Sequence, residues 1–270
     1  PKASNVFFIL PPLLIFHGYL KSNRWFILLV VGIFYILAKL LINGYMDGIL
    51  TLYALSTLLL LNQFNGDHKN KLLLLLISLQ GCVLVSIKNE GVFIFSILVF
   101  CLFFVNMRQL KYFFKQSWIL LIPYIFWLIW RLACQNFDVQ GDIEEGLLSN
   151  KSGFSVLALI HLINSRLTIE NLTLIFQHVF TSKYYLFGLV AIVIAIQNRF
   201  AHWTNLDSLI CAFICLFFTF LTMVYLLTPY DIYWHLKGSA TRTTLPIQLA
   251  CFILLLNSLR QLNFRGTDRG

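Results

Sequence analysis

Charged residues are scarce in this chain. Only 11% of its 270 residues are charged and 59% are hydrophobic, whereas soluble domains carry about 25% charged residues. Apolar runs such as 72–77, continued through Val85, recur too often for a water-soluble fold to bury them. The runs are also continuous and lack the alternating pattern of a membrane barrel. We therefore expect an all-α, polytopic transmembrane helical bundle.

Several chemical signatures are missing as well. The sequence has no P-loop, no G-x-G-x-x-G and no H-E-x-x-H pattern, so nothing indicates nucleotide-driven transport or zinc proteolysis. No CxxC pair with a matching partner occurs, and the six cysteines fall almost entirely inside apolar runs, where free cysteine packs like a small hydrophobe. The net charge of +9 comes from bases that punctuate the apolar runs, which is a topology signal. We expect no nucleic-acid partner.

The apolar runs predict about nine spans. A span needs about 20 apolar residues, and the candidates are 5–20, 25–43, 46–62, 71–87, 91–107, 115–134, 184–198, 207–227 and 243–260. If 21–24 is cytoplasmic, eight of the eleven acidic residues fall on the outer side. The short inner loops then hold more basic than acidic residues, as the positive-inside rule requires. The whole chain, 1–270, is expected to be a single transmembrane domain.

One long outer loop, 135–183, interrupts this pattern. Its first part is polar and acidic, and its second part, 154–180, is apolar but broken by polar residues. We interpret the second part as two amphipathic helices lying in the outer membrane interface. The alternative is a tenth crossing, which would place the basic C-terminal segment, 260–269, outside.

Three short segments hold most of the functional side chains, and all three fall on the outer side. The first ends at Asp47, a carboxylate that can bind a metal, accept a proton, or simply hydrate as a loop charge. The second is Lys88-Asn89-Glu90-Gly91, pressed between two spans with almost no loop. Lys88 suits a phosphate, Glu90 could pair with Lys88, and Asn89 is then free to bind a hydroxyl. A tight charged turn, with Gly91 fitting the turn, is the alternative.

The third segment, 228–242, is the densest. Trp234 beside His235 suits stacking on a sugar face together with a hydrogen bond to a hydroxyl. Arg242, at the start of the last span, suits a phosphate because its planar guanidinium pairs with anionic oxygens. Interfacial anchoring by Tyr, Trp and Arg side chains remains the alternative for this segment.

The three segments together resemble polytopic glycosyltransferases of the GT-C class, which include bacterial relatives of the protein mannosyltransferases and aminoarabinose transferases. Gly44-Tyr45-Met46-Asp47 looks like the G-Y-A-D segment of bacterial members. Lys88-Asn89-Glu90-Gly91 looks like their K-N/P-E-G segment. Asp231-Ile232-Tyr233-Trp234-His235-Leu236, followed by Ser239 and Arg242, looks like their D-L-x-W-H-L-x-x-S-x-x-R segment. Met46 and Gly48 depart mildly from the family pattern.

The resemblance implies a function and a location. The donor would be a polyprenyl-phosphate sugar, and the acceptor a glycan, lipid or protein at the outer face of a bacterial inner membrane, facing the periplasm or exterior. No cofactor is certain, and a divalent metal stays open. The family carries a key acid in an early outer loop that has no counterpart here, and the chain starts at Pro1 without an initiator Met. We therefore expect a fragment that lacks the N-terminal spans.

The expected site follows residue by residue from the matched segments. Asp47 and Glu90 are the expected catalytic residues. The expected substrate-binding residues are Tyr45, Lys88, Asn89, Asp231, Trp234, His235, Ser239 and Arg242.

Three other functions compete with this one. A transporter or lipid-oligosaccharide flippase would need polar residues at mid-span, whereas the charges here gather at one side. An O-antigen-type polymerase would show an arginine-rich outer loop, but 135–183 begins acidic. A non-catalytic membrane assembly subunit differs from an enzyme only in activity.

Overall fold

The computed structural model describes residues 4–20, 23–43, 46–67, 70–105, 117–136, 164–198, 200–201, 203–228 and 230–267. Within these ranges the protein is all-helical, which confirms the expected fold class. The helices are α1 (Ser4–Leu20), α2 (Asn23–Asn43), α3 (Met46–Gly66), α4 (Lys71–Ile87), α5 (Glu90–Val105), the 3-10 helix η2 (Ser117–Leu121), α7 (Ile122–Asn136), α10 (Ile169–Phe180), α11 (Tyr185–Gln197), α12 (Asn205–Leu227), α13 (Ile232–Thr243) and α14 (Leu245–Thr267).

Each of the nine expected apolar ranges coincides with a helix, and 115–134 corresponds to η2 followed by α7. Polar side chains cap the N-termini of several of these helices. The Asn70 side chain accepts a hydrogen bond of 3.1 Å from the backbone N–H of Leu73 at the start of α4. Thr204 and Asp207 form a reciprocal capping box at the start of α12. Such caps satisfy backbone donors that have no partner within the helix.

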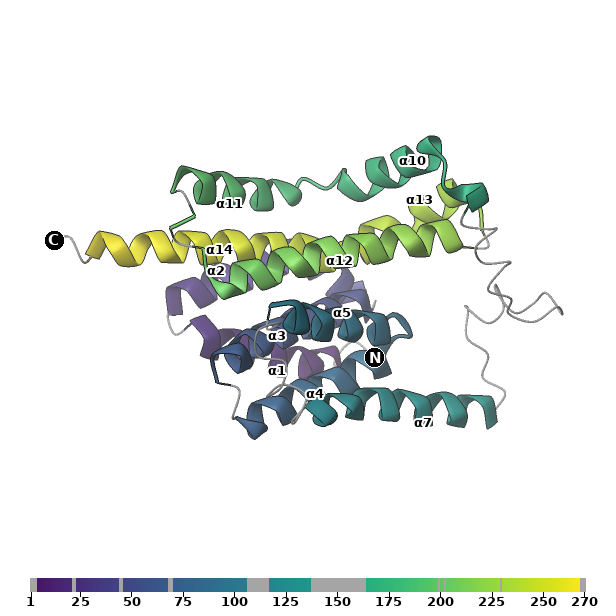
Figure 1. Ribbon diagram of the computed structural model, residues 1–270, viewed down its shortest axis with the longest axis horizontal. Helices are drawn as coiled ribbons and strands as arrows, with labels where there is room; N and C mark the ends of the chain where they lie inside the picture. Colours follow the sequence, from purple (N-terminus) through teal and green to yellow (C-terminus); the bar gives the residue numbers. More distant parts are fainter. Residues whose placement is uncertain are drawn as a thin grey trace.

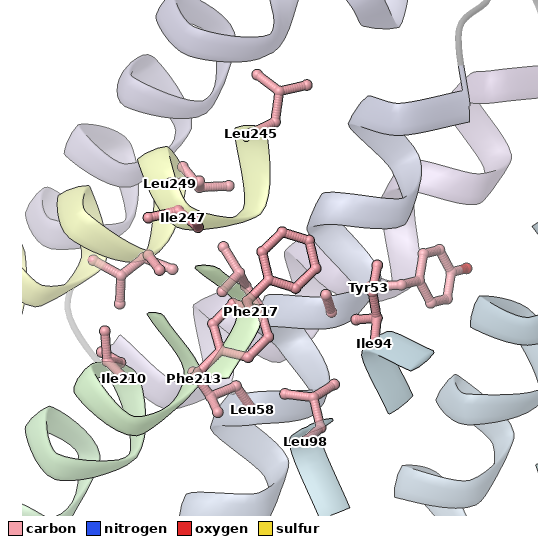
Figure 2. Packing of buried hydrophobic residues seen from close by; sticks show 14 of the residues in the cluster. Tyr53, Leu58, Ile94, Leu98, Ile210, Phe213, Phe217, Leu245, Ile247 and Leu249 are labelled. Atoms are coloured by element: carbon pink, nitrogen blue, oxygen red, sulfur yellow. The ribbon is translucent and has the colours of Figure 1, made fainter. Parts of the chain in front are cut away.

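Helix α3 is the centre of the bundle (Figure 1). It packs against α1, α2, α4, α5, α12 and α14, and every residue from Asp47 to Leu61 is buried. A helix that is apolar on all sides is stable only when other helices surround it. Figure 2 shows part of the resulting core, where Leu58 of α3 lies near Leu98 of α5 and Phe213 of α12. The N-terminal turn of α3, which contains Asp47, is therefore buried.

The number of helices that could cross a membrane is smaller than expected. Among the described residues, two helical stretches are long and apolar enough, Asn205–Leu227 and Ile232–Leu262. A third is added if α10 and α11 form one broken span. This differs from the nine spans that the sequence predicts. Five other apolar stretches, such as Lys71–Ile87, are only 10–17 residues long, below the roughly 20 residues that a straight span needs.

The long loop ends in helix α10, which meets α11 at an angle of 87°. Helix α10 packs against α12 and α13, and α11 packs along α14 (Figure 1). Only Ile175 and Val179 of α10 are buried, while Ile169 is 84% exposed. The first of the two expected interfacial helices falls mostly in 137–163, outside the described residues. The expected position of α10 in a membrane interface stays a prediction.

A polar network joins α12 and α14 at the end of the bundle where α12 begins. Asp207, almost fully buried, accepts hydrogen bonds from the backbone and hydroxyl of Thr204 at 2.8 and 2.7 Å. Asn257 of α14 donates to the other carboxylate oxygen of Asp207 at 2.9 Å and to the Thr204 hydroxyl at 3.1 Å. Arg260 donates to Asn257 at 3.1 Å. The buried carboxylate is thus fully hydrogen-bonded, as a stable interior requires.

Candidate functional site

Three residues expected to form the site meet at one end of the bundle. Asp47 lies in the first turn of α3, Lys88 follows the last turn of α4, and Arg242 lies in the last turn of α13. The ammonium nitrogen Nζ of Lys88 lies 2.6 Å from Oδ1 of Asp47. The guanidinium nitrogen Nη1 of Arg242 lies 4.0 Å from Oδ2 of the same carboxylate. Residues far apart in sequence therefore form one charged cluster, which we call the Asp47 cluster.

The carboxylate is the buried member of the Asp47 cluster. The Asp47 side chain is 8% exposed, whereas those of Lys88 and Arg242 are 33% and 34% exposed. Oδ2 of Asp47 is buried and has no hydrogen-bond partner among the described residues. A buried charged oxygen without a partner is costly, and such groups often mark functional sites. The two cations, in contrast, can be reached from outside.

The position of each charge also suits its helix. A carboxylate in the first turn of α3 and an ammonium group just after α4 both complement the helix dipoles. The hydroxyl of Thr51 adds a 2.8 Å hydrogen bond to the carbonyl of Asp47. These contacts fix the backbone beneath the Asp47 carboxylate.

The turn 88–91 is tight, and its backbone leaves no room for a side chain at position 91. Gly91 donates a 2.9 Å backbone hydrogen bond to the carbonyl of Lys88. A Cβ atom on Gly91 would lie 1.9 Å from the carbonyl oxygen of Leu84. Glycine is therefore required here by the close approach of α5 to the last turn of α4.

The possible pairing of Lys88 with Glu90 does not appear among the contacts of the described residues. Lys88 instead donates to Asp47 across the α3–α4 interface, and Glu90 is exposed in the first turn of α5. The reason is geometric: α3 and α4 pack side by side, which brings Lys88 at the end of α4 to Asp47 at the start of α3. Asn89 is half-buried within the turn, and Val92 donates to its backbone carbonyl at 3.3 Å.

Helix α13 and the residue before it supply four more of the expected residues: Asp231, Trp234, His235 and Ser239. The side chain of Asp231 caps α13 by accepting a 2.9 Å hydrogen bond from the backbone N–H of Trp234. Trp234 is 65% exposed and its ring centroid lies 5.5 Å from that of Tyr230. The structure thus gives Asp231 a capping position and leaves Trp234 on the surface, where a ligand or lipid can contact it.

One face of α13 turns toward the bundle. His235, Ser239 and Arg242 are spaced four and three residues apart, so they share this face. The hydroxyl of Tyr225 on α12 lies 3.1 Å from that of Ser239 and 2.7 Å from that of Thr243. Ser239 is therefore engaged within the protein. Nδ1 of His235 is buried and without a hydrogen-bond partner in the described part of the chain, and the His235 ring lies edge-on to Tyr225 with centroids 5.2 Å apart.

Sequence reasoning missed Arg166. Its guanidinium Nη1 donates to the backbone carbonyl of Thr228 and lies 3.5 Å from that of Tyr230. It thereby attaches the end of the long loop to the segment that leads into α13. The signal in the sequence was a base interrupting an apolar stretch, but its partner carbonyls carry no side-chain signature. Tyr45, the remaining expected residue, lies outside the described residues.

No group of three or more His, Cys, Asp or Glu side chains that could hold a metal occurs within the described ranges. Comparisons with protein-family models, curated proteins and solved structures find no match to the chain. The site is therefore interpreted from its own geometry. A buried carboxylate with one unpartnered oxygen, beside two accessible cations, can bind an anion at the cations and a hydroxyl group at the carboxylate.

Proposed function

We propose that the protein is a membrane glycosyltransferase of the GT-C class, acting on a polyprenyl-phosphate sugar at the outer face of a bacterial inner membrane. The observation that carries the proposal is the meeting of Asp47, Lys88 and Arg242 at one end of an apolar helical bundle. Each residue comes from a different one of the three segments that resemble this family.

The chemistry needs the charges that the Asp47 cluster contains. Lys88 and Arg242 bind the phosphate of the donor. Asp47 takes the proton of the acceptor hydroxyl as that oxygen forms a bond to the anomeric carbon of the sugar. The bond between the anomeric carbon and the phosphate oxygen breaks, and its electron pair leaves with the polyprenyl phosphate. The two cations stabilise the negative charge that grows on this leaving group.

Two further groups from α13 suit the sugar. The exposed ring of Trp234 offers a stacking face, and the unpartnered Nδ1 of His235 offers a hydrogen bond to a hydroxyl group. Asn89 adds a polar side chain beside Lys88, and Glu90 is a second carboxylate near the rim of the site. A divalent metal remains open in this proposal.

The membrane placement has support of its own. Large apolar side chains are exposed along α2, α7 and α11, including Val31, Ile129 and Val193 at 60%, 60% and 51%. Contiguous exposed apolar surface of this kind needs lipid or another partner to cover it. The proposal retains the nine crossings, with the shorter helices spanning a locally thinned bilayer.

The length of the last helical stretch indicates where α13 lies relative to the membrane. The helical stretch Ile232–Leu262 has 31 residues, which is about 46 Å at roughly 1.5 Å per residue. The hydrocarbon core is about 30 Å thick. About ten residues therefore extend beyond it, and the least apolar part is α13, where His235 and Arg242 lie. This leaves the Asp47 cluster at the level of the lipid headgroups.

Steady-state transfer assays on the full-length protein, with a polyprenyl-phosphate sugar as donor, test the proposal. Arg242→Ala and Lys88→Ala should weaken use of the donor about ten- to a hundredfold, since charge-assisted contacts contribute about 1.5–3 kcal/mol each. Asp47→Asn should lower turnover and should not weaken donor binding. Lys237→Ala, an exposed cation on the same helix, serves as the control. Unchanged kinetics in all three variants, with normal expression, would favour the non-catalytic assembly subunit.

A further inference from the structure

In the Asp47 cluster, the two cations lie at different distances from the buried carboxylate. The buried carboxylate holds the accessible ammonium group of Lys88 at 2.6 Å, while Arg242 remains 4.0 Å away from the second carboxylate oxygen. An anion that approaches from outside therefore meets two cations first. It must compete with Asp47 for Lys88.

We propose that Lys88 is exchanged between two anions: Asp47 holds it while the site is empty, and the phosphate of the lipid donor takes it on binding. The inference rests on the proposed function and concerns how the same site is regulated. While Asp47 holds Lys88, Oδ1 is occupied by the ammonium group and cannot accept a proton from an acceptor hydroxyl. Release of Lys88 makes the carboxylate available only when a donor is in place.

The difference in burial explains why Lys88, and not Asp47, moves in the exchange. Asp47 lies in the first turn of the central helix and is surrounded by neighbours, so the carboxylate cannot move far. Lys88 follows the end of α4, and its long flexible side chain is one third exposed. The cation is thus the mobile partner and the carboxylate the fixed one. A phosphate placed between Lys88 and Arg242 gains contacts to both, whereas Asp47 contacts only Lys88 closely.

The exchange predicts the order of substrate binding. The acceptor hydroxyl needs an accessible carboxylate oxygen near the reacting carbon. Oδ2 of Asp47 is buried, and Lys88 occupies Oδ1 until the phosphate arrives. The lipid donor therefore binds first and the acceptor second. A purely structural ion pair makes the opposite prediction for the phosphate, because removal of Asp47 would then leave Lys88 poorly placed to bind it.

The effect of Asp47→Asn on phosphate binding distinguishes an exchanged Lys88 from a purely structural ion pair. The probe is polyprenyl phosphate without a sugar, titrated into the full-length protein in nanodiscs of uncharged lipid. Asp47→Asn should tighten its binding about five- to tenfold, because a neutral amide competes for Lys88 less well than a carboxylate does. Weaker or unchanged binding in Asp47→Asn would overturn the exchange, as would a wild-type protein that does not bind the probe.

Matched variants complete the test. Glu170→Gln removes an exposed carboxylate outside the Asp47 cluster and should change the affinity less than twofold, since exposed charges are screened. In a Lys88→Met background the gain from Asp47→Asn should disappear, and persistence of the gain would overturn the proposal. If Asp47→Asn does not fold, Asp47→Ser carries the same expected sign.

Two comparisons distinguish a lipid ligand from free phosphate, and the exchange of Lys88 from sugar transfer. Inorganic phosphate in place of the lipid should show the same sign with weaker affinity, and binding of inorganic phosphate alone would overturn the assignment to a lipid. Because the probe carries no sugar, failure of sugar transfer with the expected binding pattern contradicts the proposed enzyme and leaves the exchange intact.

Discussion

Lys88 and Asp47 join the C-terminal end of α4 to the N-terminal end of α3 through a single contact of 2.6 Å. The pair lies between two helices that the sequence separates by a short connection at their other ends. It therefore fastens the open end of a helical hairpin. Its charges also complete the Asp47 cluster.

Removing one partner of this pair should destabilise the protein. Lys88→Met leaves a buried carboxylate without its close cation, which costs up to about 3–5 kcal/mol in fully buried pairs and less here because Lys88 is one third exposed. The double variant Asp47→Asn with Lys88→Met should be more stable than the two single changes predict by addition. Chemical unfolding of the four proteins in detergent measures this coupling. Strict additivity would show that the contact contributes nothing to stability.

Gly91→Ala should lower the free energy of unfolding by about 1–3 kcal/mol, the usual cost of overpacking. The added Cβ would meet the backbone carbonyl of Leu84, which cannot rotate away as a flexible side chain could. Gly238→Ala is the matched control, because nothing lies within 4 Å of its Cβ position in the middle of α13. That change should be neutral or stabilising. Equal effects of the two substitutions, measured by thermal unfolding, would contradict the close-packed turn.

Residues 47, 88–90 and 231–242 should share one membrane face. Single cysteines at positions 90 and 237, both exposed, should react with an impermeant thiol reagent from the outer side in a variant without the native cysteines. A cysteine at position 67, in the connection at the far end of α3, should react from the inner side. Labelling of 90 and 237 from opposite sides would refute the topology, and the proposed site with it.

Asn257→Leu should destabilise the protein by about 1–3 kcal/mol, because it removes a donor from the buried carboxylate of Asp207. Thr219→Val, which removes only an exposed hydrogen bond within α12, should change stability far less. Unfolding of both variants in detergent provides the comparison. Sugar transfer should persist in any Asn257→Leu protein that folds, since this network lies at the opposite end of the bundle from the Asp47 cluster.

The sequence predicts the helices well, but it predicts only part of the side-chain contacts between them. Continuous apolar runs ended by polar residues locate each helix within a few residues, as for 71–87 and α4. Asp47, Lys88 and Arg242 are recognisable as site candidates from their segments. The pairing of Lys88 with Asp47 rather than Glu90 is not recognisable, because it depends on how α3 and α4 pack.

Other features depend on local geometry that the sequence does not display. Ser239 points toward Tyr225 because α12 and α13 pack together, and Arg166 binds backbone carbonyls that any sequence would have. Asp231 is the exception. An aspartate just before a helix commonly caps it, so its capping position could have been anticipated. The smaller number of long spans reflects helix lengths, since five apolar stretches are only 10–17 residues long.

The polar network around Asp207 has a mechanical consequence for α12 and α14. It fastens these two long helices together at one end through Asn257 and Thr204. At the opposite end, the chain leaves α12 at Thr228 and returns through α13, which packs on both. The Tyr225 hydroxyl contacts Ser239 and Thr243 at this second end, so α12 and α14 are held at both ends. These contacts at the two ends together limit how far α13, and with it Arg242, can shift relative to Asp47.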